Sequence, residues 1–195
     1  MFNAVKAAAL FLAVLVPALF AAGCAGMRPA GSALDIPYPL RPGANEALAM
    51  IAAAQGVQIY ECRAGKDGGA YEWRFVAPEA DLYDAHGAKV GHHYAGPHWE
   101  SADGSRVAGT VKASAGAPAA GAIPWLLLAA KSDGPKGSLS NVSSVLRVHT
   151  SGGEAPAGGC SQASAGTQVR VDYSADYYFY APLPPMAFGA PSLGY

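Results

Sequence analysis

Hydrophobic and polar positions alternate with a period of two over most of the chain after residue 56, in short runs bounded by glycine, proline and aspartate. The first two runs, residues 57–62 and 71–76, are separated by a glycine-containing turn. Val57 and Ile59 share one face of the first run. Such alternation is typical of antiparallel strands with one buried face, so the two runs predict a β-hairpin.

Further runs follow along the rest of the chain. They are residues 81–83, 89–94, 99–100, 106–113, 123–131, 142–150, 169–173 and 175–180. Residues 123–131 are apolar on both faces, which suits a central buried strand. The pattern predicts an all-β fold, a single β-sandwich or barrel-like domain of about 8–10 short antiparallel strands.

One stretch favours a different element. Residues 46–54 consist of good helix formers, with Leu48 and Ile51 three positions apart. Asn45 is a suitable N-cap and Gly56 a suitable stop signal. The sequence therefore predicts one short N-terminal helix ahead of the first strand.

The N-terminus resembles an export signal. Lys6 is followed by an apolar run, residues 7–20, which is too short to span a bilayer as a helix. Small residues then lead into Cys24, as in a bacterial lipobox, where the cysteine is lipidated. The alternative is ordinary secretion, with cleavage after Ala25 for example. Residues 1–23 are therefore predicted to be a signal peptide.

This start divides the chain into a signal peptide and three further segments. Residues 24–43 are a lipidated cysteine and a tether, residues 44–181 the β-rich domain, and residues 182–195 a proline-rich tail. The predicted location is the bacterial cell envelope, on the periplasmic side of a membrane and held there by the lipid. Secretion is the alternative location.

Composition narrows the choice of partners. The 195 residues include 24 glycines and 15 prolines without a repeat period, which favours a turn-rich globular fold. The formal net charge is −1 and no run of lysine and arginine occurs, so no nucleic-acid partner is expected. The sequence identifies no protein partner.

Two cysteines remain if Cys24 carries lipid. Cys62 lies in a predicted strand and Cys160 at the end of a loop, and an oxidising compartment favours a disulfide between them. The alternative is a reactive thiol paired with a histidine.

Candidate chemistry concentrates in residues 91–100. Four histidines lie close together in the sequence: His86, His92, His93 and His98. Adjacent strand residues point to opposite faces, so His92 and His93 cannot both join one site. We therefore predict no metal site and no cofactor. No nucleophile motif is present either.

The candidate binding residues are His93, Tyr94, Trp99 and Glu100. A turn at Gly96-Pro97 is expected to place the His93 ring beside a buried Trp99, with the imidazole hydrogen-bonded to a backbone carbonyl of the turn. Residues 176–180 carry aromatic rings on both faces, and the outer face is a possible platform for a sugar or an aromatic ligand.

Several stretches together resemble the secreted proteins grouped as domain of unknown function 3455. These stretches are 39–42, 58–62, 93–100, 103–105, 123–127, 152–160 and 173–180. The resemblance covers roughly residues 37–181 and implies a secreted, β-rich single domain with the two cysteines paired. His93 and Trp99 match positions of the family pattern, whereas His92 and His98 do not. The family implies no activity.

Two hypotheses about function follow. The first is a non-enzymatic binding or structural domain, anchored in the envelope or secreted, with a glycan or small molecule as its ligand. The second is a hydrolase or metal-dependent enzyme that uses His93 with Glu100 or Asp103.

Overall fold

The computed structural model describes residues 36–185, so the predicted signal peptide, Cys24, most of the tether and most of the tail lie outside the described residues. The chain forms eight strands: β1 (Glu46–Ala64), β2 (Tyr71–Tyr83), β3 (Lys89–Tyr94), β4 (His98–Ser101), β5 (Arg106–Ala115), β6 (Trp125–Ser132), β7 (Ser144–Gly152) and β8 (Gln168–Pro182). Within residues 36–185 three short 3₁₀ turns accompany them: η2 (Tyr38–Leu40), η3 (Lys66–Gly68) and η4 (Gln162–Ser164). No helix among the described residues is long and apolar enough to cross a membrane.

The eight strands form one closed barrel in which each strand pairs antiparallel with its neighbours in sequence. The barrel closes where β8 pairs with β1, through a register that includes Ala54↔Ala175 and Gln58↔Val171. Closure pairs both edges of the sheet within the barrel, which is the usual way for an antiparallel sheet to avoid edge-to-edge association. Beyond the barrel, β2 before Ala80 and β8 before Tyr173 pair only with β1. The predicted all-β, barrel-like class is confirmed, and the sandwich alternative does not apply.

The predicted N-terminal helix is wrong. Residues 46–54 are the first half of β1, and they pair with β8. Burial alternates along them, since Ala52 and Ala54 are buried while Leu48 and Ile51, whose spacing favours a helix, are exposed. Helix propensity differs by at most about 0.7 kcal/mol between ordinary residues. The hydrogen bonds that close the barrel outweigh that preference.

The barrel interior is filled by alternate residues of the strands. The largest fully buried members are Trp99, Tyr177 and Phe179. On the neighbouring strand β1, the fully buried members of the same cluster are alanines, Ala52 and Ala54, and Ala52 is paired with Tyr177. Small side chains on β1 therefore leave room for the aromatic rings.

A second apolar cluster lies on the outside of β6, β7 and β8, where it is covered by η2. It comprises Leu40, Trp125, Leu127, Leu146, Val148 and Tyr178. Leu40 is completely buried there, so this part of the predicted tether packs against the barrel. The cluster explains why residues 123–131 are apolar on both faces. It also covers the ring of Tyr178, on the face considered as a ligand platform.

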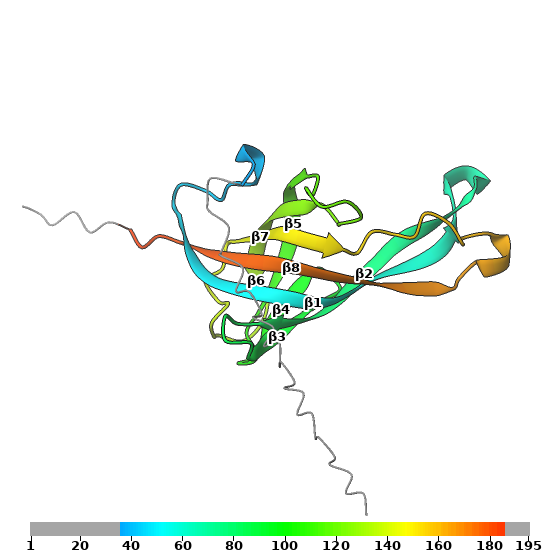
Figure 1. Ribbon diagram of the computed structural model, residues 1–195. Helices are drawn as coiled ribbons and strands as arrows, with labels where there is room; N and C mark the ends of the chain where they lie inside the picture. The colour runs from blue at the N-terminus through cyan, green and yellow to red at the C-terminus, as the bar shows by residue number, and fades with distance from the viewer. Residues whose placement is uncertain (1–35, 186–195) are drawn as a thin grey trace, which may run out of the picture. The chain divides into compact units, whose positions relative to one another are not determined.

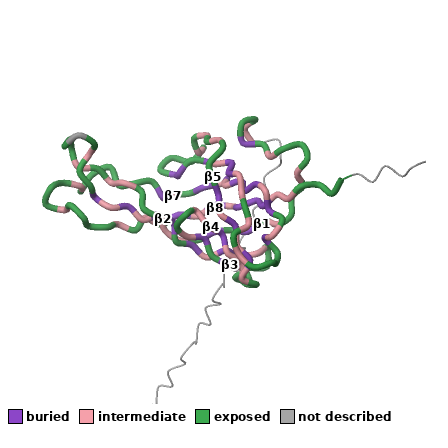
Figure 2. The backbone as a smooth tube through the Cα atoms, turned by 180° about the vertical axis from the view of Figure 1, so that it is seen from behind, coloured by how far each residue is buried: buried purple, intermediate pink, exposed green. Residues whose placement is uncertain are grey.

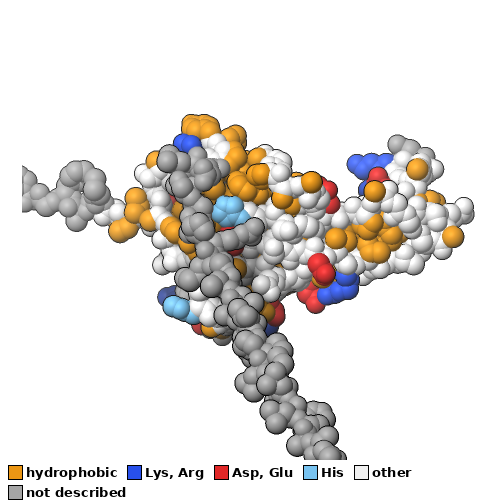
Figure 3. All heavy atoms as spheres, viewed as in Figure 1, with side chains coloured by type: hydrophobic (Ala, Val, Ile, Leu, Met, Phe, Trp, Pro, Cys, Tyr) orange, Lys and Arg blue, Asp and Glu red, His pale blue; other side chains and the backbone are white. Residues whose placement is uncertain are grey.

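The end of β1 and the starts of β2 and β8 extend together beyond the rest of the barrel as a projecting arm, residues 60–75 and 158–170 (Figure 1). Most of its residues are exposed or half-buried, in contrast to the barrel strands (Figure 2). On the face shown in Figure 3, charged side chains of both signs lie next to one another, and hydrophobic ones are scattered over arm and barrel.

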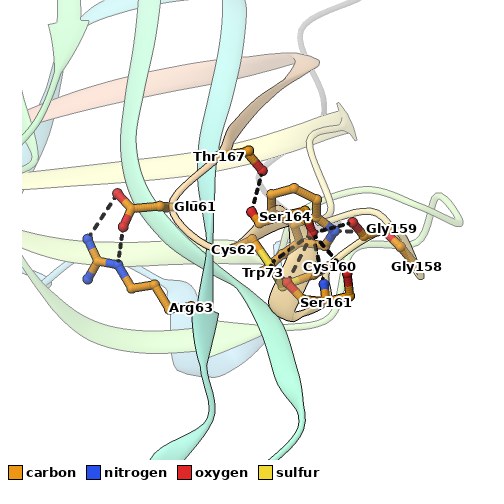
Figure 4. Close-up of a disulfide and its surroundings, with 10 residues drawn as sticks. All are labelled: Glu61, Cys62, Arg63, Trp73, Gly158, Gly159, Cys160, Ser161, Ser164 and Thr167. Carbon is orange, nitrogen blue, oxygen red and sulfur yellow. Dashed lines mark hydrogen bonds and ion pairs between the residues drawn. A yellow bond between two sulfur atoms is a disulfide. The ribbon is translucent and has the colours of Figure 1, made fainter.

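A disulfide between Cys62 and Cys160 holds the arm together (Figure 4). Trp73 donates a hydrogen bond from its indole nitrogen to the carbonyl of Gly158 across 2.8 Å, on the same side of the arm. The disulfide predicted from the sequence is therefore present in the structure. It fixes the β7–β8 connection to the β1–β2 hairpin.

Candidate ligand-binding site

A cavity of about 430 Å³ lies inside the barrel and opens at the end from which the arm projects. Its lining is largely apolar and comes from all eight strands and two connecting segments. The lining residues are Gln58, Tyr60, Phe75, Val76, Pro78, His93, Gly96, Pro97, Trp99, Val111, Ile123, Pro124, Leu126, Leu128, Arg147 and Tyr177. Phe75, Val76 and Val111 are exposed and form the rim, whereas Trp99, Leu128 and Tyr177 are buried at the floor.

His93 and Trp99 form the centre of the floor. They are directly opposed in the β3–β4 register, and their rings stack with centroids 4.5 Å apart and an interplanar angle of 11°. Tyr177 meets both rings edge-on, at 5.0 Å from His93 and 5.4 Å from Trp99. The expected burial of Trp99 beside the imidazole is confirmed.

The hydrogen bond of His93 fixes its tautomer. Its Nδ1 lies 2.8 Å from the carbonyl oxygen of His98, directly after the Gly96-Pro97 turn. A carbonyl only accepts, so Nδ1 carries the proton and Nε2 keeps a lone pair. Burial lowers the pKa of His93 from 6.5 to about 3, so the imidazole is neutral at physiological pH.

Three tyrosines add hydroxyl groups to this interior. Tyr60 donates to the carbonyl of Gly153 across 2.6 Å, and the hydroxyls of Tyr173 and Tyr177 lie 3.4 Å apart. Burial raises the pKa of all three phenols. These groups are therefore neutral hydrogen-bonding groups.

Arg147 brings the positive charge. It faces the barrel interior from β7, where it is paired in register with Leu126 on one side and Tyr177 on the other. Its Nε and Nη2 donate to the carbonyl of Pro124 at 3.2 and 2.8 Å. Its charge acts on Tyr60, His93, Tyr173 and Tyr177. No carboxylate in the described part of the chain forms an ion pair with it.

Gln58 contributes an unsatisfied donor. The side chain lines the cavity from β1 and is only 2% exposed. Its Nε2 has no hydrogen-bond partner among the described residues. A buried amide without a partner costs about 1–3 kcal/mol, so an acceptor placed in the cavity would recover part of that free energy.

The sequence matches a family model described as Protein of unknown function (DUF3455) over residues 42–181. The chain belongs to this family. The match spans every residue that lines the cavity. Comparisons with curated proteins and with solved structures give no match.

In this DUF3455 protein the four residues predicted as one binding site divide between two faces of the barrel wall. His93 and Trp99 point inward, whereas Tyr94 and Glu100 point outward and are joined by a 2.7 Å hydrogen bond from the Tyr94 hydroxyl. Tyr94 and Glu100 line a separate outer groove with Asp81. Strand alternation separates residues that are adjacent in the sequence.

The acids proposed to act with His93 in catalysis also lie apart from it. Asp103 lies in the β4–β5 turn, where its carboxylate accepts hydrogen bonds from Ser105 and from the backbone of Ser138, and the Ser105 hydroxyl in particular lowers its pKa. His98 bonds to Ala95 and Asp133 instead. No group of three metal-ligating side chains occurs among the residues that the structure describes. His93 therefore has neither Glu100 nor Asp103 as a partner.

Three cavity residues of the DUF3455 barrel were not predicted: Gln58, Tyr60 and Arg147. The run 57–62 pointed to Val57 and Ile59 as its buried face, but Gln58, Tyr60 and Cys62 are the buried ones. A polar residue at an inward strand position, such as Arg147 between Leu146 and Val148, was the signal available in the sequence.

Proposed function

We propose that this DUF3455 protein is an exported, non-enzymatic protein that binds a small molecule inside its barrel. The observation that supports this most directly is the cavity of about 430 Å³. It lies in the size range of small-molecule sites, about 300–1,000 Å³, and shares their apolar walls and few polar groups. Eight-stranded barrels are just wide enough to hold one small ligand.

The chemistry of the lining supports binding rather than hydrolysis. The tyrosines are neutral, His93 is neutral and stacked on Trp99, and neither predicted carboxylate reaches the imidazole. Such a site can hold and orient a molecule by shape and hydrogen bonds. Export is supported by the N-terminal sequence and by the disulfide, which persists in oxidising compartments.

A cavity-blocking variant tests the proposal. A screen of small aromatic compounds, short fatty acids and glycans, read out by melting temperature, should yield a ligand that stabilises the wild-type protein. Leu126→Trp should fill the cavity and abolish that stabilisation. Leu48→Trp makes the same change on the outer surface, where Leu48 is 48% exposed, and should retain it.

Failure of the proposal would look different. If every ligand found stabilises Leu126→Trp as much as the wild type, the molecules bind elsewhere and the cavity is not the site. If no compound binds the wild-type protein at all, the cavity has no ligand-binding role and the protein is a structural domain.

A further inference from the structure

We propose that the cavity selects small aromatic carboxylates, with Arg147 and Gln58 binding the carboxylate and the aromatic floor holding the ring. This inference rests on the proposed function and adds the charge and the shape of the ligand to it.

The cavity lining carries a positive charge and no negative charge to compensate it. Among the described residues that line it, Arg147 alone is charged, because burial keeps His93 and the tyrosines neutral. No lining residue is acidic. Glu154 is the carboxylate whose charge reaches Tyr60, and it is exposed. An arginine without an acidic partner in a partly dry site attracts an anion, because its charge is poorly compensated by solvent.

The cavity also contains hydrogen-bond donors that a ligand can use. The two bonds of Arg147 to Pro124 use Nε and Nη2, and the Arg147 side chain also lies close to the Tyr177 hydroxyl. A guanidinium has five N–H donors, so Arg147 retains donors for another acceptor. Gln58 Nε2 has no acceptor and is almost fully buried. A carboxylate has two oxygens and about four lone pairs, so it can accept from a guanidinium and from an amide together. A phosphate or sulfate would bring more acceptors than these two side chains satisfy.

The walls of the cavity determine the shape of the rest of the ligand. Stacked His93 and Trp99 form the floor with Tyr177, and Ile123 and Leu126 form an aliphatic side. A flat ring fits between such surfaces, since aromatic contacts are favourable edge-on and offset. The cavity volume of about 430 Å³ suits a one-ring or two-ring acid and excludes a long acyl chain within the barrel.

The test compares cinnamate with methyl cinnamate, which has the same ring without the charge. Isothermal titration of the wild-type protein should give about tenfold tighter binding of the acid, the effect of one charged hydrogen bond. Arg147→Gln should weaken cinnamate binding by about tenfold and leave the ester unchanged. Gln58→Leu should also weaken the acid selectively. Arg63→Gln removes an exposed arginine on the arm and should change neither affinity.

The outcomes separate the two proposals. If acid and ester bind equally and both are lost in Leu126→Trp, the cavity binds small molecules but selects no anion, and this inference is overturned alone. If neither probe binds and the wider screen also fails, the proposed function falls with it. The acid–ester comparison uses the wild-type protein, so it decides the matter even if Arg147→Gln does not fold.

Discussion

His93 shows how one buried side chain links stability to pH. Its ring is stacked on Trp99 and its Nδ1 proton is donated to His98, so the folded protein holds the neutral form. The unfolded chain has no such preference and takes up a proton near pH 6.5. Between the two pKa values the unfolded state binds more protons than the folded state. Stability is therefore fully present above pH 6.5 and is lost as the pH falls towards about 3.

The difference between the His93 pKa in the folded and unfolded states predicts that the free energy of unfolding depends measurably on pH. Below pH 6.5 the free energy of unfolding should fall by up to about 1.4 kcal/mol per pH unit because of His93 alone. The carboxylates of Glu46 and Asp103 contribute in the same direction, but only below about pH 4.5 and 3.8, where they begin to protonate in the unfolded chain. Denaturant titrations between pH 4.5 and 6.5 therefore avoid these carboxylates, and comparison with a variant that lacks the His93 imidazole separates this group from the other four histidines.

The matched variant is His93→Gln, which keeps a donor for the His98 carbonyl without a titrating ring. Its stability should be nearly flat over that pH range. A slope equal to that of the wild type would assign the pH dependence to another group.

At the scale of the element, β1 shows why a helix-forming sequence can become a strand. Its inward positions Ala52 and Ala54 are small because Trp99 and Phe179 occupy the barrel interior, and its outward positions are free to carry any residue. The inward alanines of β1 are therefore explained by packing in the barrel interior rather than by their helix propensity.

The alternation of inward and outward residues along β1 predicts different effects for two neighbouring substitutions. Ala54→Leu should destabilise the protein by about 1–3 kcal/mol, because a leucine overfills a closed interior. Ala53→Leu, the next residue and exposed, should change stability by at most about 0.5 kcal/mol. Denaturant titration of the two variants is the measurement. Equal effects would contradict the alternation of β1.

The sequence reveals strands more readily than it reveals what they enclose. The period of two, the turns and the cysteines were sufficient for an all-β barrel-like domain with a Cys62–Cys160 disulfide. The position of β1 was not predictable because alanine is compatible with both elements. The cavity was missed because Gln58 and Arg147 are distant in sequence and meet only through strand pairing, whereas Tyr94 and Glu100 are adjacent to His93 and Trp99 but lie on the opposite face.

At the scale of the whole molecule, the proposed function combines a ligand-binding barrel with an N-terminal anchor in a membrane. Leu40 is packed on the barrel, so the segment available as a tether ends before it. We propose Cys24 as the lipidated residue, with the membrane as the partner of that lipid.

Cys24→Ala tests this anchor. In a bacterial host the wild-type protein should fractionate with membranes, and the variant should be soluble or remain unprocessed. Ser32→Ala, within the same predicted tether, is the control and should behave as the wild type. A wild-type protein found wholly in the soluble fraction without a lipid would contradict the lipobox reading and favour plain secretion.

The seam that closes the barrel also sets the order in which it can fold. Because β8 completes the sheet by pairing with β1, the first strand lacks one of its two neighbours until residues 168–182 have arrived. Contacts between segments so far apart in sequence form slowly. Under the proposed export, a chain that is still crossing the membrane stays open, and closure waits until its last strand has reached the far side.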